Sequence, residues 1–295
     1  MKRNIAVGVV WLMLFPGVCA AQHEIDAKPH MTIEEAMRTL HSDQPQAQMD
    51  AIDTLVSLGA KDKAAEIASL LNSTNSVVKM DAVSALGTLG ATTYAPEIAK
   101  LLKDPERLEG GEGFASLLNG ISVGSVAAQA LGQLGAKQYS ADIALLLTDK
   151  SVFARSNSAI ALGKLHAREY AKQIAVLLED QEAGGVITSA AFALGQLGAK
   201  EYAKNIADLL EDPDESVRCA AVEALGQMEA KEYASALAKR ISDPTSCIPL
   251  SQWPKTDKKI SLGAMVEQIF RAWGVDSSGG RVSQPAPVSD PASSQ

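Results

Sequence analysis

The stretch Ala193-Leu194-Gly195-Gln196-Leu197-Gly198-Ala199-Lys200-Glu201-Tyr202-Ala203 recurs with variations along most of the chain. Its pattern is typical of the end of one helix, a tight turn and the start of a second helix, because Gly198 stands where a left-handed residue is favoured. The apolar pattern of the second helix continues at Ile206, Ala207, Leu209 and Leu210. The stretch therefore predicts a helical hairpin that serves as a repeating unit.

The repeats keep a nearly constant register. Successive units are 31, 45, 31, 32 and 31 residues apart when they are aligned on Lys63, Tyr94, Tyr139, Tyr170, Tyr202 and Tyr233. A Leu-Gly pair, or Leu55-Val56 in the first unit, precedes each of these residues by eight positions. Such a period is typical of a solenoid, because a single hairpin cannot bury its apolar stripe and stacked hairpins share one core.

Glycine and proline mark the ends of the predicted helices. The turn inside a unit carries glycine in four units, at Gly59, Gly90, Gly135 and Gly198, but His166 and Glu229 in two others. Since a Cβ strains a left-handed turn, we expect the turns at His166 and Glu229 to differ in shape. Second helices are expected to end at Asp104-Pro105, Asp212-Pro213 and Asp243-Pro244. The glycine of each Leu-Gly pair lies inside a helix, which predicts that a neighbouring helix comes close.

The motif Leu194-Gly195-Gln196-Leu197-Gly198-Ala199 with Tyr202-Ala203, and the unit opening from Asp212 to Val217-Arg218, are similar to HEAT-like repeats of the phycobilisome-lyase type. The resemblance covers about residues 46–244, and Lys79 and Arg155 take the place of Arg218 in two other units. It implies an all-α fold, an α-solenoid of about six helical-hairpin HEAT-like repeats with capping helices at both ends. A tetratricopeptide array is the second choice, because it expects a period of about 34 residues.

Both ends of the array carry helix signals. Thr32 and Glu35 form the pattern of a capping box at the start of a helix over 33–40. After Ser261, apolar residues at helical spacing predict an amphipathic helix: Leu262, Met265, Val266, Ile269, Phe270 and Trp273. We expect this helix to cap the last hairpin, with docking to a membrane surface or a partner as the alternative. The array then occupies 31–244, a linker and the capping helix 245–275, and a disordered tail 276–295.

The first 30 residues have the pattern of an export signal. Lys2 and Arg3 precede an apolar run, and small residues end at Ala20, so 1–20 is predicted to be a signal peptide and 21–30 a flexible leader. This predicts a periplasmic or secreted protein without an integral membrane span after processing; an uncleaved anchor is the alternative. A new terminus Ala21-Gln22-His23 could bind Cu(II) or Ni(II) through His23, although a frayed leader without metal is favoured.

Two cysteines, Cys219 and Cys247, remain after the predicted processing. In an oxidising compartment they could form a disulfide. Their spacing is equally compatible with a helical cysteine and a free thiol in a loop, because the sequence does not supply the distance between their Cα atoms.

Candidate partner contacts lie in two regions. The Gly-rich insertion at 105–123 contains Glu112 and Phe114 but lacks the Lys-Ser/Thr of a phosphate-binding loop, so we expect a long loop that contacts a partner. The second helices are expected to expose polar residues that bind protein or only face solvent: Lys172, Lys204, Asn205 and Asp208.

The charge and the residue pattern limit the function. A formal net charge of −8 without a basic run argues against nucleic acid as a partner. No convergent set of catalytic groups is expected, since the acidic residues recur on predicted exposed faces and His166 stands singly in a turn. We therefore predict an exported, non-catalytic protein-binding scaffold without a cofactor. The alternatives are a bilin-lyase-like enzyme, which the family resemblance implies, and a structural subunit of an envelope assembly.

Overall fold

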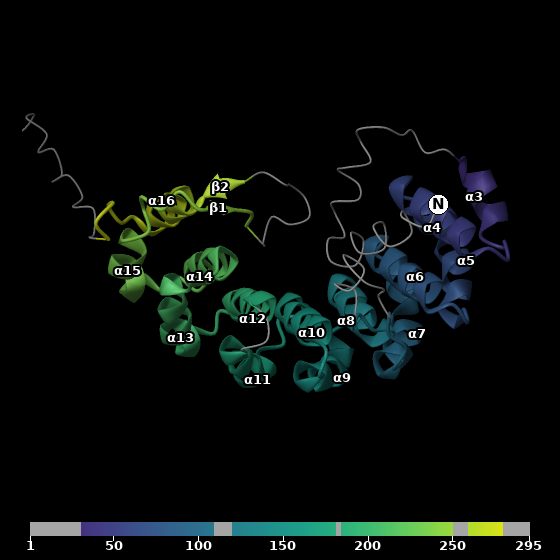
Figure 1. Ribbon diagram of the computed structural model, residues 1–295, viewed down its shortest axis with the longest axis horizontal. Helices are drawn as coiled ribbons and strands as arrows, with labels where there is room; N and C mark the ends of the chain where they lie inside the picture. The colour runs from purple at the N-terminus through teal and green to yellow at the C-terminus, as the bar shows by residue number, and fades with distance from the viewer. Residues whose placement is uncertain (1–30, 109–119, 181–183, 250–258, 280–295) are drawn as a thin grey trace, which may run out of the picture.

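The fold is an arc of helical hairpins (Figure 1). A computed structural model describes residues 31–108, 120–180, 184–249 and 259–279. Six hairpins stack in sequence order, and the first helix of each packs against the first helix of the next. The predicted all-α solenoid of about six repeats is confirmed. No helix in these ranges is both long and apolar enough to cross a membrane.

The first helices of the hairpins are regular α-helices, and four of the six begin with a side-chain cap. Asn75 caps α6, and its side chain accepts hydrogen bonds from the backbone N–H groups of Val77 and Val78 at 3.0 and 3.2 Å. Asp214 caps α14 through the N–H of Ser216 at 2.7 Å. The six helices are α4 (Pro45–Ser57), α6 (Ser76–Thr88), α8 (Val123–Gln133), α10 (Val152–Lys164), α12 (Gly184–Gln196) and α14 (Glu215–Gln227).

The second helix of each hairpin is shorter than the repeat pattern indicates. In the fifth hairpin a 3₁₀ turn at Lys200–Tyr202 precedes α13, and a second one at Leu209–Glu211 follows it. The tyrosine therefore ends a 3₁₀ turn and does not begin the α-helix. The α-helical segments are α5 (Ala64–Ser69), α7 (Ala95–Lys100), α9 (Ser140–Ala144), α11 (Ala171–Val176), α13 (Ala203–Asp208) and α15 (Ala234–Ala238).

The turns at His166 and Glu229 have the same shape as the glycine turns, so the prediction of a different shape is wrong. Their φ angles are 50° and 51°, against 59° for Gly198. The N–H of Ala167 bonds to the C=O of Leu162 at 3.0 Å, as that of Ala199 bonds to Leu194 at 3.1 Å. Both side chains are exposed, so the cost of a left-handed residue, about 1–2 kcal/mol, comes without a steric clash in the core.

The mid-helix glycines set the distance between neighbouring first helices. A Cβ added at Gly163 would lie 2.9 Å from Cα of Ala193, and one at Gly132 would lie 2.8 Å from Cα of Ala161. These distances are shorter than real Cβ contacts, so only glycine allows α8, α10 and α12 to pack this closely. The predicted close approach is confirmed, and it explains why the helix tolerates the glycine.

Both ends of the array are covered as predicted. At the N-terminus, α3 (Ile33–Thr39) begins with the capping box of Thr32 and Glu35 and packs on α4. At the C-terminus, β1 (Ser246–Cys247) and β2 (Ile260–Ser261) form a short antiparallel pair before α16 (Leu262–Trp273), which packs on α14 and α15. Leu262 and Val266 of α16 are fully buried. Polar caps and buried apolar stripes thus close both ends of the core.

The first four residues of the predicted disordered tail, 276–279, are ordered against the array, so the prediction is wrong for them. Residues 276–279 form a turn in which the N–H of Gly279 bonds to the C=O of Asp276 at 2.9 Å. A Cβ at Gly279 would lie 2.9 Å from the carbonyl carbon of Ala234, so this turn lies against α15. The remaining tail, 280–295, is outside the described residues.

A row of ion pairs, here called the ladder, joins the first helix to the end of the second helix in three of the six hairpins. Lys79 Nζ lies 3.0 Å from Asp104 Oδ2, and Arg155 Nε lies 2.8 Å from Asp180 Oδ2. In each pair the two residues are 25 positions apart. Both partners of these two pairs are at most 15% exposed. The ladder therefore links the two limbs of a hairpin where they are shielded from water.

The same spacing recurs in the last hairpin, between Arg218 and Asp243. Their Nε and Oδ2 atoms are 3.8 Å apart. Hydrogen bonds from Thr245, together with the guanidinium groups of Arg218 and Arg240, lower the pKa of the Asp243 carboxyl. This ladder pair is therefore ionised under ordinary conditions.

Candidate functional site

The inner surface of the arc is formed by the first helices, with the second helices on the outside (Figure 1). The repeated leucine of each first helix faces the second helices. The residues five and two positions before this leucine, and two positions after it, therefore lie on the opposite side of the helix. These 18 residues define the inner surface: Asp50, Asp53, Ser57; Asp81, Ser84, Thr88; Val126, Gln129, Gln133; Asn157, Ile160, Lys164; Ser189, Phe192, Gln196; Ala220, Glu223 and Gln227.

The inner surface is acidic at its N-terminal end. Asp50 and Asp53 lie on α4 and Asp81 lies on the neighbouring α6, whereas the one cationic residue of the inner surface, Lys164, lies on α10. Glu223 on α14 adds a carboxylate at the other end. Sequence reasoning missed this surface, because it looked for binding residues on the second helices. The spacing from the repeated leucine could have identified it.

The three aspartates at the acidic end lack cationic partners. None of them forms an ion pair with a described Lys or Arg side chain, although Asp50 Oδ1 accepts a hydrogen bond from Gln46 Nε2 at 2.8 Å. Asp81 is 4% exposed, and its Oδ2 atom has no hydrogen-bond partner. Burial, reinforced by the charge of Asp50, raises the pKa of Asp53 to about 6. Burial and then the charges of Asp53 and Asp50 raise the pKa of Asp81 well above its usual value.

This acidic end predicts a pH-dependent stability. Because the folded protein raises both pKa values, it binds protons that the unfolded chain releases, so stability falls as the pH rises from about 4 through 6. We expect Asp81→Asn to raise the free energy of unfolding near pH 7.5 by more than about 1 kcal/mol, because it removes a buried carboxyl that resists ionisation, and to change it little near pH 4. Urea unfolding at the two pH values measures the effect.

The matched control for this prediction is Asp43→Asn, because Asp43 is exposed at the turn before α4. It removes the same charge from the same end of the array without touching the inner surface. An equal gain of stability for Asp43→Asn and Asp81→Asn, or no gain for Asp81→Asn near pH 7.5, would contradict the inference that the buried Asp81 carboxyl lowers stability.

The outer surface carries the second-helix residues that the sequence singled out. Lys172 lies on α11, while Lys204, Asn205 and Asp208 lie on α13, and all four are exposed. Lys204 Nζ and Asp208 Oδ2 are 2.8 Å apart, but both side chains are more than 60% exposed, so this pair contributes little stability. Nothing in the structure shows what these residues bind, and their role stays a prediction.

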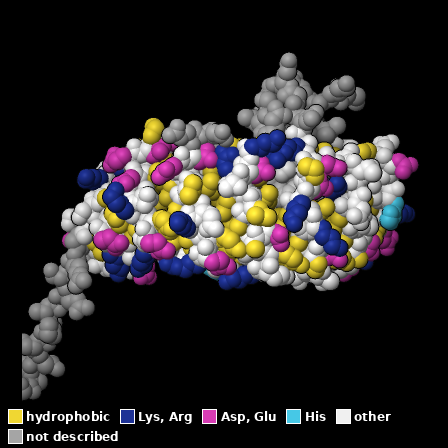
Figure 2. Space-filling model, turned by 90° about the horizontal axis from the view of Figure 1, so that it is seen from below, with side chains coloured by type: hydrophobic (Ala, Val, Ile, Leu, Met, Phe, Trp, Pro, Cys, Tyr) yellow, Lys and Arg dark blue, Asp and Glu magenta, His cyan; other side chains and the backbone are white. Residues whose placement is uncertain are grey.

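Apolar side chains also reach the outer surface. Figure 2 views this side and shows hydrophobic side chains near its middle, between scattered acidic and basic ones. Leu145 and Val176, at equivalent positions of the third and fourth hairpins, are 65% and 68% exposed. The outer surface is therefore mixed in character, unlike the acidic end of the inner surface.

The described ends of the Gly-rich insertion are held together and fixed to the array. Arg107 and Ser122 form an antiparallel bridge, and Arg107 Nη2 lies 3.1 Å from Asp149 Oδ1. The Ser151 hydroxyl donates to the C=O of Gly120 at 2.5 Å. The predicted contact residues Glu112 and Phe114 lie outside the described residues, as do His23 and the whole predicted signal peptide and leader.

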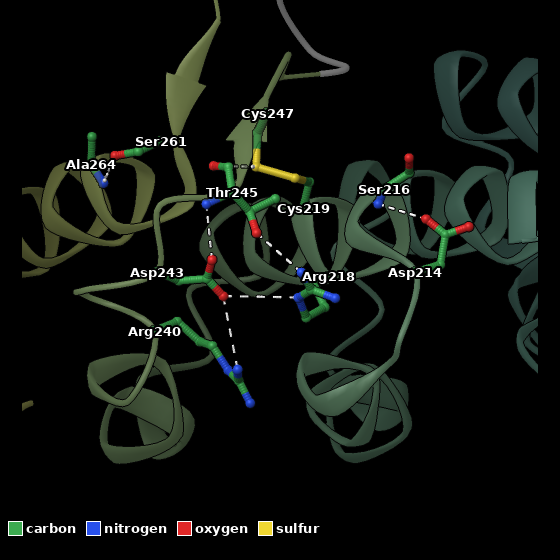
Figure 3. Close-up of a disulfide and its surroundings, with 10 residues drawn as sticks. All are labelled: Asp214, Ser216, Arg218, Cys219, Arg240, Asp243, Thr245, Cys247, Ser261 and Ala264. Carbon is green, nitrogen blue, oxygen red and sulfur yellow. Dashed lines mark hydrogen bonds and ion pairs between the residues drawn. A yellow bond between two sulfur atoms is a disulfide. The ribbon is translucent and has the colours of Figure 1, made fainter.

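A disulfide joins Cys219 of α14 to Cys247 of β1, with a sulfur–sulfur distance of 2.04 Å (Figure 3). The sequence left open whether the two cysteines pair, and the structure contains the disulfide. The nearby guanidinium of Arg218 donates to the Thr245 hydroxyl at 3.0 Å. A cleft of about 230 Å³ opens beside the disulfide, and Glu223 and Lys259 contribute to its walls. The disulfide thus fastens the C-terminal cap to α14, the first helix of the sixth hairpin.

The described residues contain no group of three or more His, Cys, Asp or Glu side chains placed to hold a metal ion. The two described histidines lie apart in the chain, His41 next to α3 and His166 in an exposed turn of the fourth hairpin. The arrangement offers extended surfaces for binding.

Comparison with known proteins agrees with this architecture. Residues 177–247 match the family model of HEAT repeats. A chain of the complex of CpcE and CpcF of phycocyanin lyase from Nostoc sp. PCC7120 superposes with a TM-score of 0.56 at 21% identity, covering 84% of this chain and 97% of that one. No curated protein sequence matches the chain significantly.

Two further solved structures have a similar fold. The Escherichia coli protein YibA gives a TM-score of 0.50 at 16% identity and covers 83% of this chain and 93% of its own. An engineered protein gives a TM-score of 0.50 at 17% identity, over 93% of this chain and 77% of its own. The hairpin stack defines the class as an α-solenoid of repeats. The hairpins at 177–247 match HEAT repeats, and the solved structures share the fold of the whole described array.

Proposed function

We propose that this HEAT-like repeat protein is an exported, non-catalytic scaffold that binds a protein partner through the inner surface of its arc. The observation that carries the proposal is the acidic end of that surface, where Asp50, Asp53 and Asp81 lie together without a cation. Ionised carboxylates that lie close together without a cation raise the free energy of the folded protein. A basic segment of a partner would lower this free energy by supplying opposite charge. The partner is therefore expected to present Lys or Arg.

The shape of the array supports binding over catalysis. Stacked hairpins create a long curved surface, and function in such folds belongs to sites on that surface. One similar structure was determined as a complex of the two proteins CpcE and CpcF. This similarity supports a scaffold that assembles with another chain, and the low identity gives no support for transferring a lyase activity.

Export is proposed from two observations. Lys2 and Arg3 precede an apolar run that ends in small residues, which is the pattern of a secretory signal. The Cys219–Cys247 disulfide supports an oxidising compartment, because such bonds persist in the periplasm and outside the cell.

Affinity capture from the envelope fraction tests the proposal with a matched pair of charge reversals. Asp50 and Asp208 are both exposed aspartates, but Asp50 lies on the inner surface and Asp208 on the outer one. We expect Asp50→Lys to reduce the captured partner at least about tenfold, since it reverses a charge at the binding surface, and Asp208→Lys to leave it unchanged.

Two other outcomes would redirect the proposal. If Asp208→Lys alone removed the partner, binding would belong to the outer surface, as the sequence first indicated. If the protein captured only copies of itself, a structural subunit of an assembly would replace the scaffold. Circular dichroism of both variants checks that each keeps the helical fold.

A further inference from the structure

The ladder is interrupted in the fifth hairpin. Ile187 of α12 stands where the fourth hairpin has Arg155 and the sixth has Arg218. The acidic half remains, because Asp212 stands where those hairpins have Asp180 and Asp243. Among the described residues no Lys or Arg pairs with the Asp212 carboxylate, whose Oδ1 atom accepts the N–H of Asp214 at 2.8 Å. The fifth hairpin thus holds half of a ladder ion pair.

An open cleft of about 600 Å³ lies at this interruption. Asp180, Asp212 and Asp214 supply its polar wall, while Ile187 and Val217 are part of its apolar wall. Val217 is 1% exposed and Asp212 is half-buried. A long side chain with an apolar stem and a cationic end matches this combination of walls.

The neighbouring hairpins show which acceptors an arginine at the ladder position contacts. Besides its contact with Asp180, Arg155 donates from Nη1 to the C=O groups of Asp149 and Lys150 at 2.9 and 3.1 Å. Arg218 donates in the same way to the C=O groups of Asp212 and Pro213, at 2.8 and 3.0 Å. A guanidinium therefore bridges the aspartate of its own hairpin and the loop before its own helix.

In the fifth hairpin, the corresponding groups are the Asp212 carboxylate and the backbone C=O of Asp180. Asp180 follows the last 3₁₀ turn of the fourth hairpin, as Asp149 follows the last 3₁₀ turn of the third. The cleft lies between these two groups, since both residues line it. The fold has therefore built a guanidinium position and left it without an internal guanidinium.

Two other hairpins lack the ladder cation, and neither leaves a free carboxylate. In the third hairpin, a Cβ at Gly124 would lie 2.5 Å from the C=O oxygen of Leu102, which leaves no room for a long side chain. Arg107 from the insertion pairs with Asp149 in its place. In the first hairpin, Gln48 and Ser73 stand at the two ladder positions, so cation and anion are both missing. Among the described hairpins, the fifth alone keeps the acid without the base.

We propose that the cleft at Ile187 and Asp212 binds an arginine side chain of the partner, which completes the ladder in trans. This inference deepens the proposed scaffold function, on which the identity of the partner as a protein rests. The guanidinium donates to the Asp212 carboxylate and to the C=O of Asp180, and its aliphatic stem packs on Ile187 and Val217. Arginine is preferred to lysine, because its planar group reaches both acceptors at once.

Titration with a small probe tests the site without the partner. Nα-acetyl-arginine methylamide is added to the labelled full-length protein, and amide signals of residues around the cleft are followed by NMR. We expect saturable shifts at Ile187 and Asp214, and none with the neutral citrulline analogue, which keeps the shape of the side chain but lacks the charge. Equal shifts with both probes, or no saturable shift with the arginine probe, would overturn the proposal.

Two variants and one control complete the test. Asp212→Asn keeps an oxygen that can accept the N–H of Asp214 and is expected to weaken the binding of the arginine probe at least tenfold, whereas Asp43→Asn, at the exposed turn before α4, leaves its affinity unchanged. Ile187→Arg supplies the guanidinium from within, so we expect it to abolish probe binding and raise the melting temperature. Unchanged probe binding in both Asp212→Asn and Ile187→Arg would overturn the site.

The test separates this site from the proposed function. If the arginine probe fails to bind while Asp50→Lys still releases a captured partner, the scaffold stands and the cleft is not its arginine site. If the probe binds as expected but no partner is captured, the cleft stands and the scaffold proposal fails.

Discussion

Leu162→Asp, in the middle of α10, is expected to destroy the cooperative unfolding of the array. Leu162 is fully buried in the core that the fourth hairpin shares with its neighbours. The change removes a large apolar side chain and leaves a carboxylate without a partner, which costs at least about 4 kcal/mol from the two effects together. Because each hairpin relies on the next for its apolar wall, the damage spreads beyond one repeat.

Circular dichroism during heating measures this loss, and the chain offers a matched control. Leu145 lies only one hairpin away, but its side chain is 65% exposed on the outer surface. Leu145→Asp is therefore expected to change the free energy of unfolding by no more than about 0.5 kcal/mol. A sharp melting transition at the wild-type temperature for Leu162→Asp would contradict a continuous shared core.

Loss of the Cys219–Cys247 disulfide is expected to lower stability by about 3.5 kcal/mol, from the chain entropy that the closed loop removes in the unfolded state. The two cysteines are 28 residues apart, so the loop includes α15 and the link to β1. The effect should be concentrated at the C-terminal end, because the bridge fastens the strands that precede α16 to α14.

Guanidinium unfolding with and without reductant measures this effect. The Cys219→Ala, Cys247→Ala variant serves as the control, because its stability must not depend on reductant. Wild-type protein whose unfolding midpoint is the same under both conditions would contradict a structural role for the bridge. Hydrogen exchange should further place the loss in α14–α16 and leave α4–α8 unchanged.

Much of the fold follows from local patterns. The repeat of Leu-Gly pairs predicts the hairpin stack, and Thr32 and Ser261 mark the starts of the two capping helices. These predictions succeed because helix periodicity and caps depend on residues within about one or two turns of each other. The turns at His166 and Glu229 were misjudged for a related reason. Packing of the two limbs sets the turn, and an exposed side chain then accepts the left-handed conformation.

The candidate sites depended far more on the tertiary structure. The sequence directed attention to Lys172, Lys204, Asn205 and Asp208, which the structure places on the outer surface. It did not indicate that Asp53 of one helix and Asp81 of the next interact, since that requires the stacking distance between α4 and α6. Their raised pKa values come from burial, which no local pattern specifies.

By itself, the sequence determined the period, the caps and the stack, because each of these follows from spacing along a single helix or hairpin. Only the tertiary structure decided that Arg107 from the insertion pairs with Asp149, and that Asp212 beside Ile187 has no such partner. The physical reason is that an ion pair depends on the positions of two charges in space. Residues dozens of positions apart come within hydrogen-bond distance only after the hairpins have packed.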